Sequence, residues 1–499
     1  MRRLYQPAPN RCNGFLSVSV YGEDMTKAPK LPLVTAKNLR LSELLSAFSY
    51  ALDITEGQPE GHCVRCCWIG MHVGEELGMS PQELWELYYV LLLKDLGCSS
   101  NAARICQLYL TNDLDFKRDF KEIDTGLSDV MRFVISHTGL KADLAERFRA
   151  VVNIFKNGGE IARELIETRC QRGADIARQL HFSEPIAVGI RDLDEHWDGR
   201  GQPMKLARTA ISPYARIALL SQCVDVFFMS RGHDAAKDEV LKRAGTWFEP
   251  EAVDAFLEIC DRDGFWDGLA APDIATRVQA LEPPHAEVEL DEDYLDDIAI
   301  AFGQVVDSKS PYTAGHSSRV ALYTDMMAEV LGLEAHQRRW LKRAALLHDV
   351  GKLGVSNTIL DKPGKLDGDE WTQMQAHALH TETILSRIGA FSELARIAGA
   401  HHERLDGKGY PHGLNAEEIS FETRIISVAD FFDALTADRP YRAAMPVWKA
   451  LEIIGESVGN AIDPVCFEAL KTAIDRIETN STTGTVYMDT EDRPLQRTA

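Results

Sequence analysis

Residues 301–317 read AFGQVVDSKSPYTAGHS and residues 47–63 read AFSYALDITEGQPEGHC, so the two stretches align without a gap at an offset of 254. The same offset places LLLKDLG (91–97) over ALLHDVG (345–351). Further along, DGRGQP (198–203) lies over DGKGYP (406–411) at an offset of 208, so the first copy is 46 residues longer between these motifs. An internal repeat of this kind predicts two copies of one domain plan.

Both copies carry the pattern of helices. Segments such as SSRVALYTDMMAEVLG, RRWLKRAALLHDVG and ETRIISVADFFDALT have apolar residues at helical spacing, with Gly, Pro and Asn between them. The sequence therefore predicts an all-α protein with two tandem helical domains. We expect a disordered N-terminus, the first copy, an acidic linker, the second copy and a disordered tail, at 1–30, 31–281, 282–293, 294–478 and 479–499.

Charge and composition restrict the partners. The formal net charge of the 499-residue chain is -22, from 54 basic and 76 acidic residues, which disfavours a nucleic-acid polymer or an anionic membrane. A small anionic ligand is still compatible with this net charge if a metal ion or a few nearby Arg and Lys side chains offset the negative field of the protein. No segment reaches the roughly 20 apolar residues of a membrane helix. Ten cysteines at irregular spacing fit a reducing compartment, so a cytoplasmic location is predicted.

Histidine and carboxylate side chains gather in the second copy. Taken singly, each is more often a surface or capping residue than a ligand, but seven within about 115 residues, on helices that must pack together, favour a metal centre. Imidazole with carboxylate suits Fe, Mn or Zn, a carboxylate such as Asp349 can bridge two ions, and the lack of Cys argues against a structural zinc site. The seven are His316, His348, Asp349, His377, His401, His402 and Asp430.

The order of these motifs resembles the HD-GYP phosphodiesterases of the HD superfamily. HD at 348–349 is followed by GK, then by a single His at 377, then by HHExxDGxGYP at 401–411. The likeness covers roughly residues 298–450 and includes KPGKL (362–366) and RPYR (439–442). It implies that all seven side chains hold two divalent transition ions, Fe or Mn, with Asp349 bridging. Some members place a Glu four residues before the upstream His; here Tyr312 stands there, so a third ion is not expected.

The resemblance also implies roles in catalysis and substrate binding. Asp349 and Lys352 would be catalytic, with Lys352 contacting the scissile phosphate. The residues that would hold the substrate are Lys352, Arg439, Arg442, Gly409 and Tyr410.

The implied reaction is hydrolysis of cyclic di-GMP to pGpG and then GMP. One alternative is another 3',3'-cyclic dinucleotide such as cyclic GMP-AMP, because the residues of these motifs contact phosphate and metal more than they contact the nucleobases. A second alternative is a non-catalytic cyclic dinucleotide receptor or adaptor, against which the intact ligand set counts.

The first copy keeps few of these residues. His62 and Asp95 stand opposite His316 and Asp349, and two ligands cannot hold a dinuclear centre. A catalytically inactive regulatory or dimerisation domain is therefore expected, and a homodimer is a candidate assembly. Cationic side chains at two former ligand positions could replace the charge of the metals, or could simply be solvated. The replaced ligand positions are Lys94, Arg169, Leu193, Asp194 and Gln222, opposite His348, His377, His401, His402 and Asp430.

Overall fold

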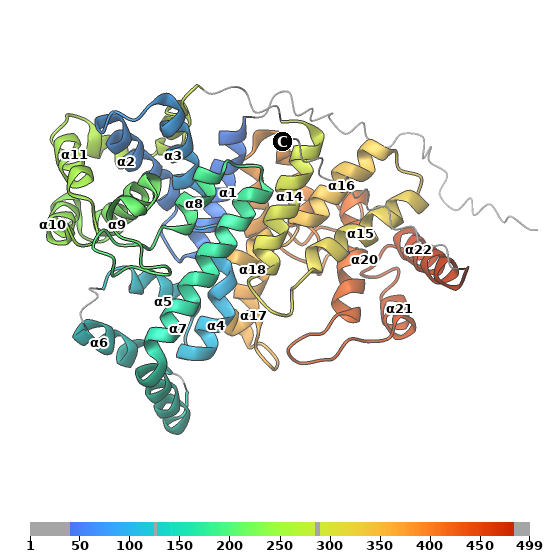
Figure 1. Ribbon diagram of the computed structural model, residues 1–499. Coiled ribbons are helices and arrows are strands. Elements are labelled where there is room, and N and C mark those ends of the chain that lie inside the picture. The colour runs from blue at the N-terminus through green and yellow to red at the C-terminus, as the bar shows by residue number, and fades with distance from the viewer. Residues whose placement is uncertain (1–39, 124–126, 141, 285–289, 484–499) are drawn as a thin grey trace, which may run out of the picture. The chain divides into compact units, whose positions relative to one another are not determined.

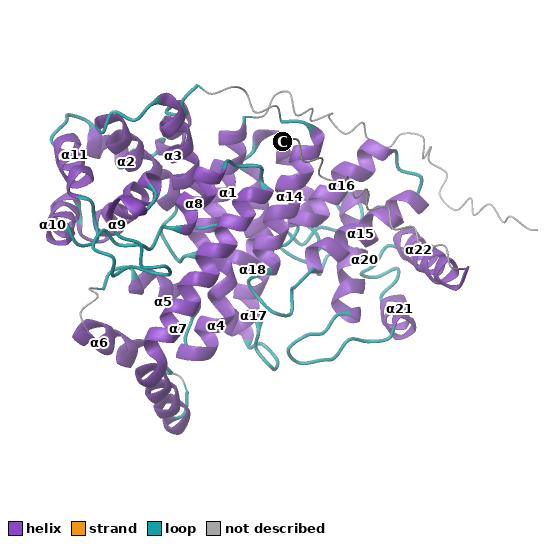
Figure 2. Ribbon diagram, viewed as in Figure 1, coloured by secondary structure: helices purple, strands orange, loops and turns teal. Residues whose placement is uncertain are grey.

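The computed structural model describes residues 40–123, 127–140, 142–284 and 290–483. These residues form helices and loops without a β-strand, so the prediction of an all-α fold is confirmed (Figure 2). Among the described residues, every helix is too short or too polar to span a lipid bilayer. The described residues all belong to one compact unit. The predicted disordered N-terminus, 1–30, lies outside the described residues.

The helices follow the chain in two series (Figure 1). The first copy contains α1 (Leu41–Thr55), α2 (His62–Glu76), α3 (Pro81–Leu93), η2 (Cys98–Asn101), α4 (Ala102–Tyr109), α5 (Asp113–Phe120), α6 (Leu127–His137), α7 (Leu144–Gln179), α8 (Glu184–Arg191), η3 (Arg208–Ala210), α9 (Pro213–Arg231), α10 (His233–Arg243), α11 (Pro250–Cys260), α12 (Phe265–Leu269) and α13 (Ile274–Ala280). The second contains α14 (Glu292–Asp307), α15 (His316–Val330), α16 (Ala335–Leu347), η4 (Val350–Gly354), α17 (Asn357–Leu360), α18 (Gly368–Ser386), η5 (Gly389–Phe391), α19 (Ser392–Gly399), α20 (Phe421–Thr436), α21 (Val447–Gly455) and α22 (Pro464–Thr483).

Two predicted boundaries differ from the structure. Helix α14 begins inside the predicted linker, because the Asp291 side chain accepts a hydrogen bond from the Tyr294 backbone N–H at 2.8 Å and caps the helix. Helix α22 continues to Thr483, five residues into the predicted tail. Polar residues at a helix end carry no stop signal of their own, so the sequence placed that end too early.

The repeat in sequence is also a repeat of helices. Shifted by the sequence offsets, α2, α3 and α8 have the same bounds as α15, α16 and α19. In both copies the first of these helices packs between two partners: α2 against α3 and α9, and α15 against α16 and α20. The extra length of the first copy folds as α5, α6 and the first half of α7.

The two copies meet through equivalent elements. Phe48 of α1 and Phe302 of α14 stand at the same repeat position, and their rings stack with centroids 3.8 Å apart. Helix α1 contacts η4, and in return α14 contacts η2. Such reciprocal contacts define an isologous interface, the kind found about a two-fold axis. The tandem chain therefore packs its copies as a symmetric dimer would.

Candidate metal centre

All seven predicted ligands come together at the ends and inner faces of second-copy helices. His316 begins α15, His348 and Asp349 follow α16, and His401 and His402 follow α19, while His377 and Asp430 lie within α18 and α20. Their ligand atoms form three overlapping groups, each compact enough to hold an ion. The groups are His316, His348 and Asp430; His348, Asp349 and His401; and His377, His401 and His402.

Three of the histidines are oriented by the backbone of their own helix. The Nδ1 atoms of His348 and His401 each lie 2.6 Å from the carbonyl oxygen three residues earlier, and that of His377 lies 2.5 Å from such an oxygen. A carbonyl can only accept, so Nδ1 carries the proton and Nε2 presents a lone pair. A hydrogen bond of this kind fixes the tautomer and the orientation of an imidazole ring, so that Nε2 can bind a metal ion.

Asp349 lies between two sets of imidazole nitrogens. Its Oδ1 is 3.5 Å from His377 Nε2 and 3.7 Å from His401 Nε2. Its Oδ2 is 3.1 Å from His316 Nε2 and 3.3 Å from His348 Nε2. One carboxylate oxygen therefore faces each set, which is the geometry a bridging carboxylate needs.

The polar atoms of the centre fit bound cations. The Nε2 atoms of His377 and His401, both acceptors, face one another at 3.4 Å. Within the described part of the chain, the buried atoms His348 Nε2 and Asp349 Oδ1 have no hydrogen-bond partner. Buried acceptors without donors are unfavourable unless something positive lies between them. Divalent metal ions would satisfy both requirements.

Burial and charge also set the protonation of these residues. Burial lowers the pKa of His377 to about 3 and that of His402 to about 4, so both imidazoles are neutral at pH 7, as ligands must be. Burial alone would lower the pKa of His348 too, but the carboxylates of Asp349 and Asp430 raise it to about 10, so without an ion a proton takes up the Nε2 lone pair at pH 7. The side of the centre that contains Asp349 and Asp430 therefore favours a bound cation.

Lys352 lies at the edge of this centre. Its Nζ contacts Asp349 Oδ2, and its side chain is partly exposed. The ring of Tyr410 lies against that of His402, with centroids 4.8 Å apart. Trp371, 47% exposed, lies edge-on to Tyr410 with ring centroids 6.1 Å apart. These side chains give the centre one cationic edge and one aromatic edge.

The other predicted substrate residues have structural partners. The Arg442 guanidinium donates to the carbonyl oxygens of Ala434 at 2.6 Å and Leu435 at 2.8 Å, and so caps the carboxyl end of α20. The Arg439 backbone N–H donates to the Arg442 carbonyl at 2.8 Å in the same turn. A Cβ at Gly409 would lie 2.5 Å from the backbone N of Arg404, so glycine is required for the loop to pack there. Contact of these three residues with substrate stays a prediction.

Sequence reasoning missed three side chains that organise the centre. Asp433 Oδ2 lies 2.7 Å from His316 Nδ1, and the same carboxylate is held by Arg319 at 2.6 Å, which orients the imidazole. Glu403 accepts hydrogen bonds from the backbone N–H groups of residues 412, 413 and 414 and shapes the loop. The internal repeat could have indicated these three residues, because the first copy keeps the same residue types at the same offsets: Arg65, Asp225 and Glu195.

The equivalent place in the first copy holds an ammonium group. Lys94 Nζ lies 3.0 Å from His62 Nε2 and 3.2 Å from Gln222 Oε1, and it contacts Asp95. These three partners stand opposite His316, Asp430 and Asp349. Burial alone would lower the pKa of Lys94, but Asp95 raises it well above its usual range. A fixed cation therefore occupies the centre of the first copy.

A second ligand position that differs in the first copy also forms an ion pair. Arg169, opposite His377, contacts Asp194, opposite His402. Burial alone would lower the pKa of the Arg169 guanidinium, but neighbouring groups that include Glu56 and Asp95 raise it. The first copy thus contains ion pairs where the second has ligand groups.

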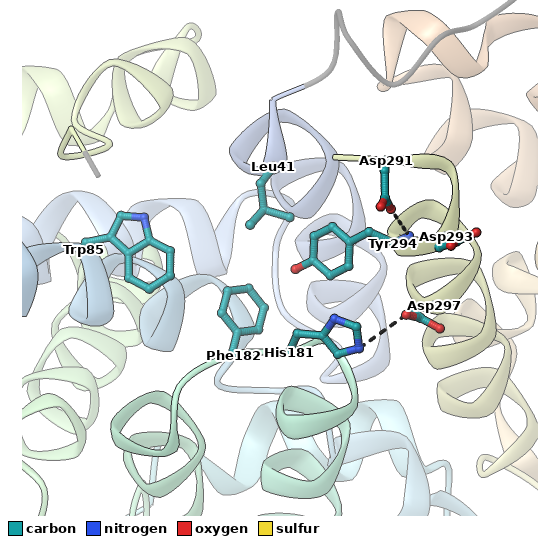
Figure 3. A pocket seen from close by; sticks show the side chains of 8 residues that line it. All are labelled: Leu41, Trp85, His181, Phe182, Asp291, Asp293, Tyr294 and Asp297. Carbon is teal, nitrogen blue, oxygen red and sulfur yellow. Dashed lines mark hydrogen bonds and ion pairs between the residues drawn. The ribbon is translucent and has the colours of Figure 1, made fainter. Parts of the chain in front are cut away.

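One cavity of the described chain is separate from this chemistry. It measures about 240 Å³ and shares no lining residue with the seven candidate ligands (Figure 3). His181 crosses its lower edge and pairs with Asp297 at 3.3 Å. Its remaining walls are aromatic, aliphatic and acidic: Leu41, Trp85, Phe182, Asp291, Asp293 and Tyr294.

Comparison with known proteins identifies a matching family and similar proteins. The profile of the HD domain family matches residues 151–238 and 301–466. The chain is 55% identical over 442 residues to the 3'3'-cGAMP-specific phosphodiesterase 3 of Vibrio cholerae serotype O1, covering 89% of this chain and 96% of that one. The cyclic di-GMP phosphodiesterase response regulator RpfG of Xanthomonas campestris pv. campestris is 41% identical over 160 residues, 32% of this chain and 42% of its own.

A solved structure is similar over most of the chain. The crystal structure of a cyclic GMP-AMP specific phosphodiesterase of V. cholerae superposes with a TM-score of 0.61 at 50% identity, covering 87% of this chain and 97% of that one. The fold and site define a metal-dependent phosphohydrolase, and this chain belongs to the HD domain family. The predictions of an HD-type fold and of a phosphodiesterase for cyclic dinucleotides are confirmed at that level.

Proposed function

We propose that this chain hydrolyses 3'3'-cGAMP in its second copy. The proposal is carried by the extent of the similarity. A relative named for that substrate matches almost end to end, whereas RpfG, named for cyclic di-GMP, matches about a third of the chain. This order reverses the expectation from the motifs, which put cyclic di-GMP first, because metal ligands and phosphate contacts carry no information about the base.

The seven ligand residues would hold two divalent transition ions, with Asp349 facing both positions. The mixture of imidazole and carboxylate favours Fe or Mn. Such ions would supply a water of lowered pKa and positive charge against the phosphoryl oxygens. In the hydrolysis, the water oxygen bonds to phosphorus, one sugar oxygen leaves, and that oxygen takes up a proton.

The chain's own side chains would orient the substrate. Lys352 places a positive charge beside Asp349, where negative charge builds on the phosphoryl group. Tyr410 and the exposed Trp371 form an aromatic edge on which a nucleobase can stack. Arg439 and Arg442 stay candidates for contact with a phosphate or a guanine, although Arg442 would first have to release the end of α20.

We also propose that the first copy is an inactive HD-type domain. Lys94 and Arg169 place cationic groups where ligands would be needed, so a metal ion would be repelled there. Two buried ligand residues, His62 and Asp95, are left, and both are engaged with Lys94.

The test is a comparison of substrates. The purified full-length protein, loaded with Mn or with Fe under reducing conditions, would be incubated with 3'3'-cGAMP, cyclic di-GMP and cyclic di-AMP. We expect the highest kcat/KM for 3'3'-cGAMP, with no turnover in an Asp349→Ala control. Equal or faster hydrolysis of cyclic di-GMP would restore the substrate first expected from the motifs.

A further inference from the structure

A buried carboxylate of the first copy reaches the second copy. Asp113 begins α5, in the segment that only the first copy has, and its relative exposure is 0%. Its Oδ1 accepts hydrogen bonds from Ser356 Oγ at 2.8 Å and from the Asn357 backbone N–H at 2.9 Å. Ser356 is the N-cap of α17. A first-copy side chain thus binds the amino end of a second-copy helical turn, where backbone N–H groups have no acceptor within the turn.

Lys309 makes a second link from the same carboxylate. Its Nζ lies 3.5 Å from Asp113 Oδ2 and donates to the Leu353 carbonyl oxygen at 2.9 Å, and the residue is 1% exposed. Burial lowers the pKa of Lys309, and Asp113 opposes that shift by favouring the charged form. Leu353 follows Lys352 within η4. The ammonium group therefore connects Asp113 to the backbone of the turn that carries Lys352.

The first copy holds Asp113 firmly. Lys117, in the same short helix, donates from Nζ to the carbonyl oxygens of Thr55 at 3.0 Å and Cys98 at 2.9 Å. The end of α1 also packs on η4, since a Cβ at Gly354 would lie 2.9 Å from Ile54 Cγ2. The position of α5 is thus set by first-copy contacts that do not involve the metal centre.

We propose that Asp113 is a positioning residue for the segment 349–357 of the other copy. One end of this segment carries Asp349 and Lys352, and the other end is fixed to Asp113 directly and through Lys309. Loss of the carboxylate removes the acceptor for two donors and leaves Lys309 buried without its counter-charge. The segment then shifts, and Lys352 loses its alignment. The inference uses the phosphodiesterase activity of the enzyme and does not depend on which dinucleotide is cleaved.

The test compares variants of the full-length protein at equal metal loading. We expect Asp113→Ala to lower kcat by roughly tenfold to a hundredfold, because small displacements of reacting groups have effects of that size. KM and metal content should stay near the wild-type values. Asp192→Asn is the matched control: Asp192 is 1% exposed, and its partners Arg191 and Ser212 both belong to the first copy. This control should lower stability while kcat stays near wild type.

A double variant tests the route through Lys309. Lys309→Met should lower kcat in the same way, and combining it with Asp113→Ala should cost little more, because residues acting through one link are not additive. Fully additive losses would refute Lys309 as the link. Unchanged kcat in Asp113→Ala, or an equal loss in Asp192→Asn, would overturn the positioning role.

A second measurement does not need catalysis. Amide hydrogen exchange of residues 350–357 should be faster in Asp113→Ala than in the wild type, while exchange of α20 should be unchanged. If the wild-type protein cleaved none of the three dinucleotides, the proposed function would fail on its own. The exchange result would still decide the inference, since unchanged exchange at 350–357 contradicts it.

Discussion

Replacing Lys94 by methionine removes the cation at the centre of the first copy. The side chains of Lys94 and Asp95 are 0% and 1% exposed, so the Asp95 carboxylate would be left buried without its positive partner. Breaking a buried pair in this way costs roughly 3–5 kcal/mol of unfolding free energy. For one cooperative unit of about 440 residues, with an unfolding entropy of about 2.1 cal/mol/K per residue, this corresponds to a fall in thermal midpoint of about 3–5 °C.

Thermal unfolding followed by circular dichroism would measure this change. Lys237→Met is the matched control, because its ion pair with Asp261 at 3.1 Å lies on the surface of the same copy. It should cost only about 0–1 kcal/mol. The double variant Lys94→Met/Asp95→Asn should recover most of the loss, since both charges are gone. Metal content should stay at the wild-type value throughout. A loss for Lys94→Met no larger than that of the surface control would refute a charge-neutralising role.

Three further predictions concern the second copy. His348→Ala and Asp349→Ala should each abolish hydrolysis and lower the metal content measured by elemental analysis, whereas Lys352→Ala should keep its metal and lower kcat; full activity in either ligand variant would contradict the assignment. Elemental analysis of the wild-type protein should find about two transition ions per chain, and a reproducible third would be inconsistent with the proposed ligand set. Trp371→Ala should weaken binding of the dinucleotide by roughly 1–3 kcal/mol, the free energy of a base stack, and so raise KM. Trp448 is 68% exposed and lies outside the site, so Trp448→Ala should leave KM unchanged.

The identity of the cyclic dinucleotide is a property that the sequence motifs do not determine. His348, Asp349 and the paired histidines at 401 and 402 are recognisable because their chemistry requires particular residue types in a particular order. Base recognition needs only a shaped and stacked surface, such as the edge formed by Trp371 and Tyr410, and many residue types can provide it. The motifs therefore predicted a phosphodiesterase for cyclic dinucleotides but favoured cyclic di-GMP, whereas the whole-chain similarity favours 3'3'-cGAMP.

The sequence by itself determined the all-α class, the repeat and the seven candidate ligands. Apolar residues at helical spacing and side chains with metal-binding chemistry are local properties, so they can be read without coordinates. Even Asp433 and Glu403 could have been found, because the first copy keeps both residue types at the same offset although it has lost most of the ligands.

Only the tertiary structure decided what these residues do to one another. It showed that Asp349 turns one oxygen to each set of histidines and that the Arg442 guanidinium caps a helix. It also showed that Asp113 reaches Ser356, 243 positions away in the chain. Contacts of this kind depend on how two copies pack about a shared interface. No periodicity or spacing within either copy encodes that packing, because it follows from the summed burial of faces that are distant in sequence.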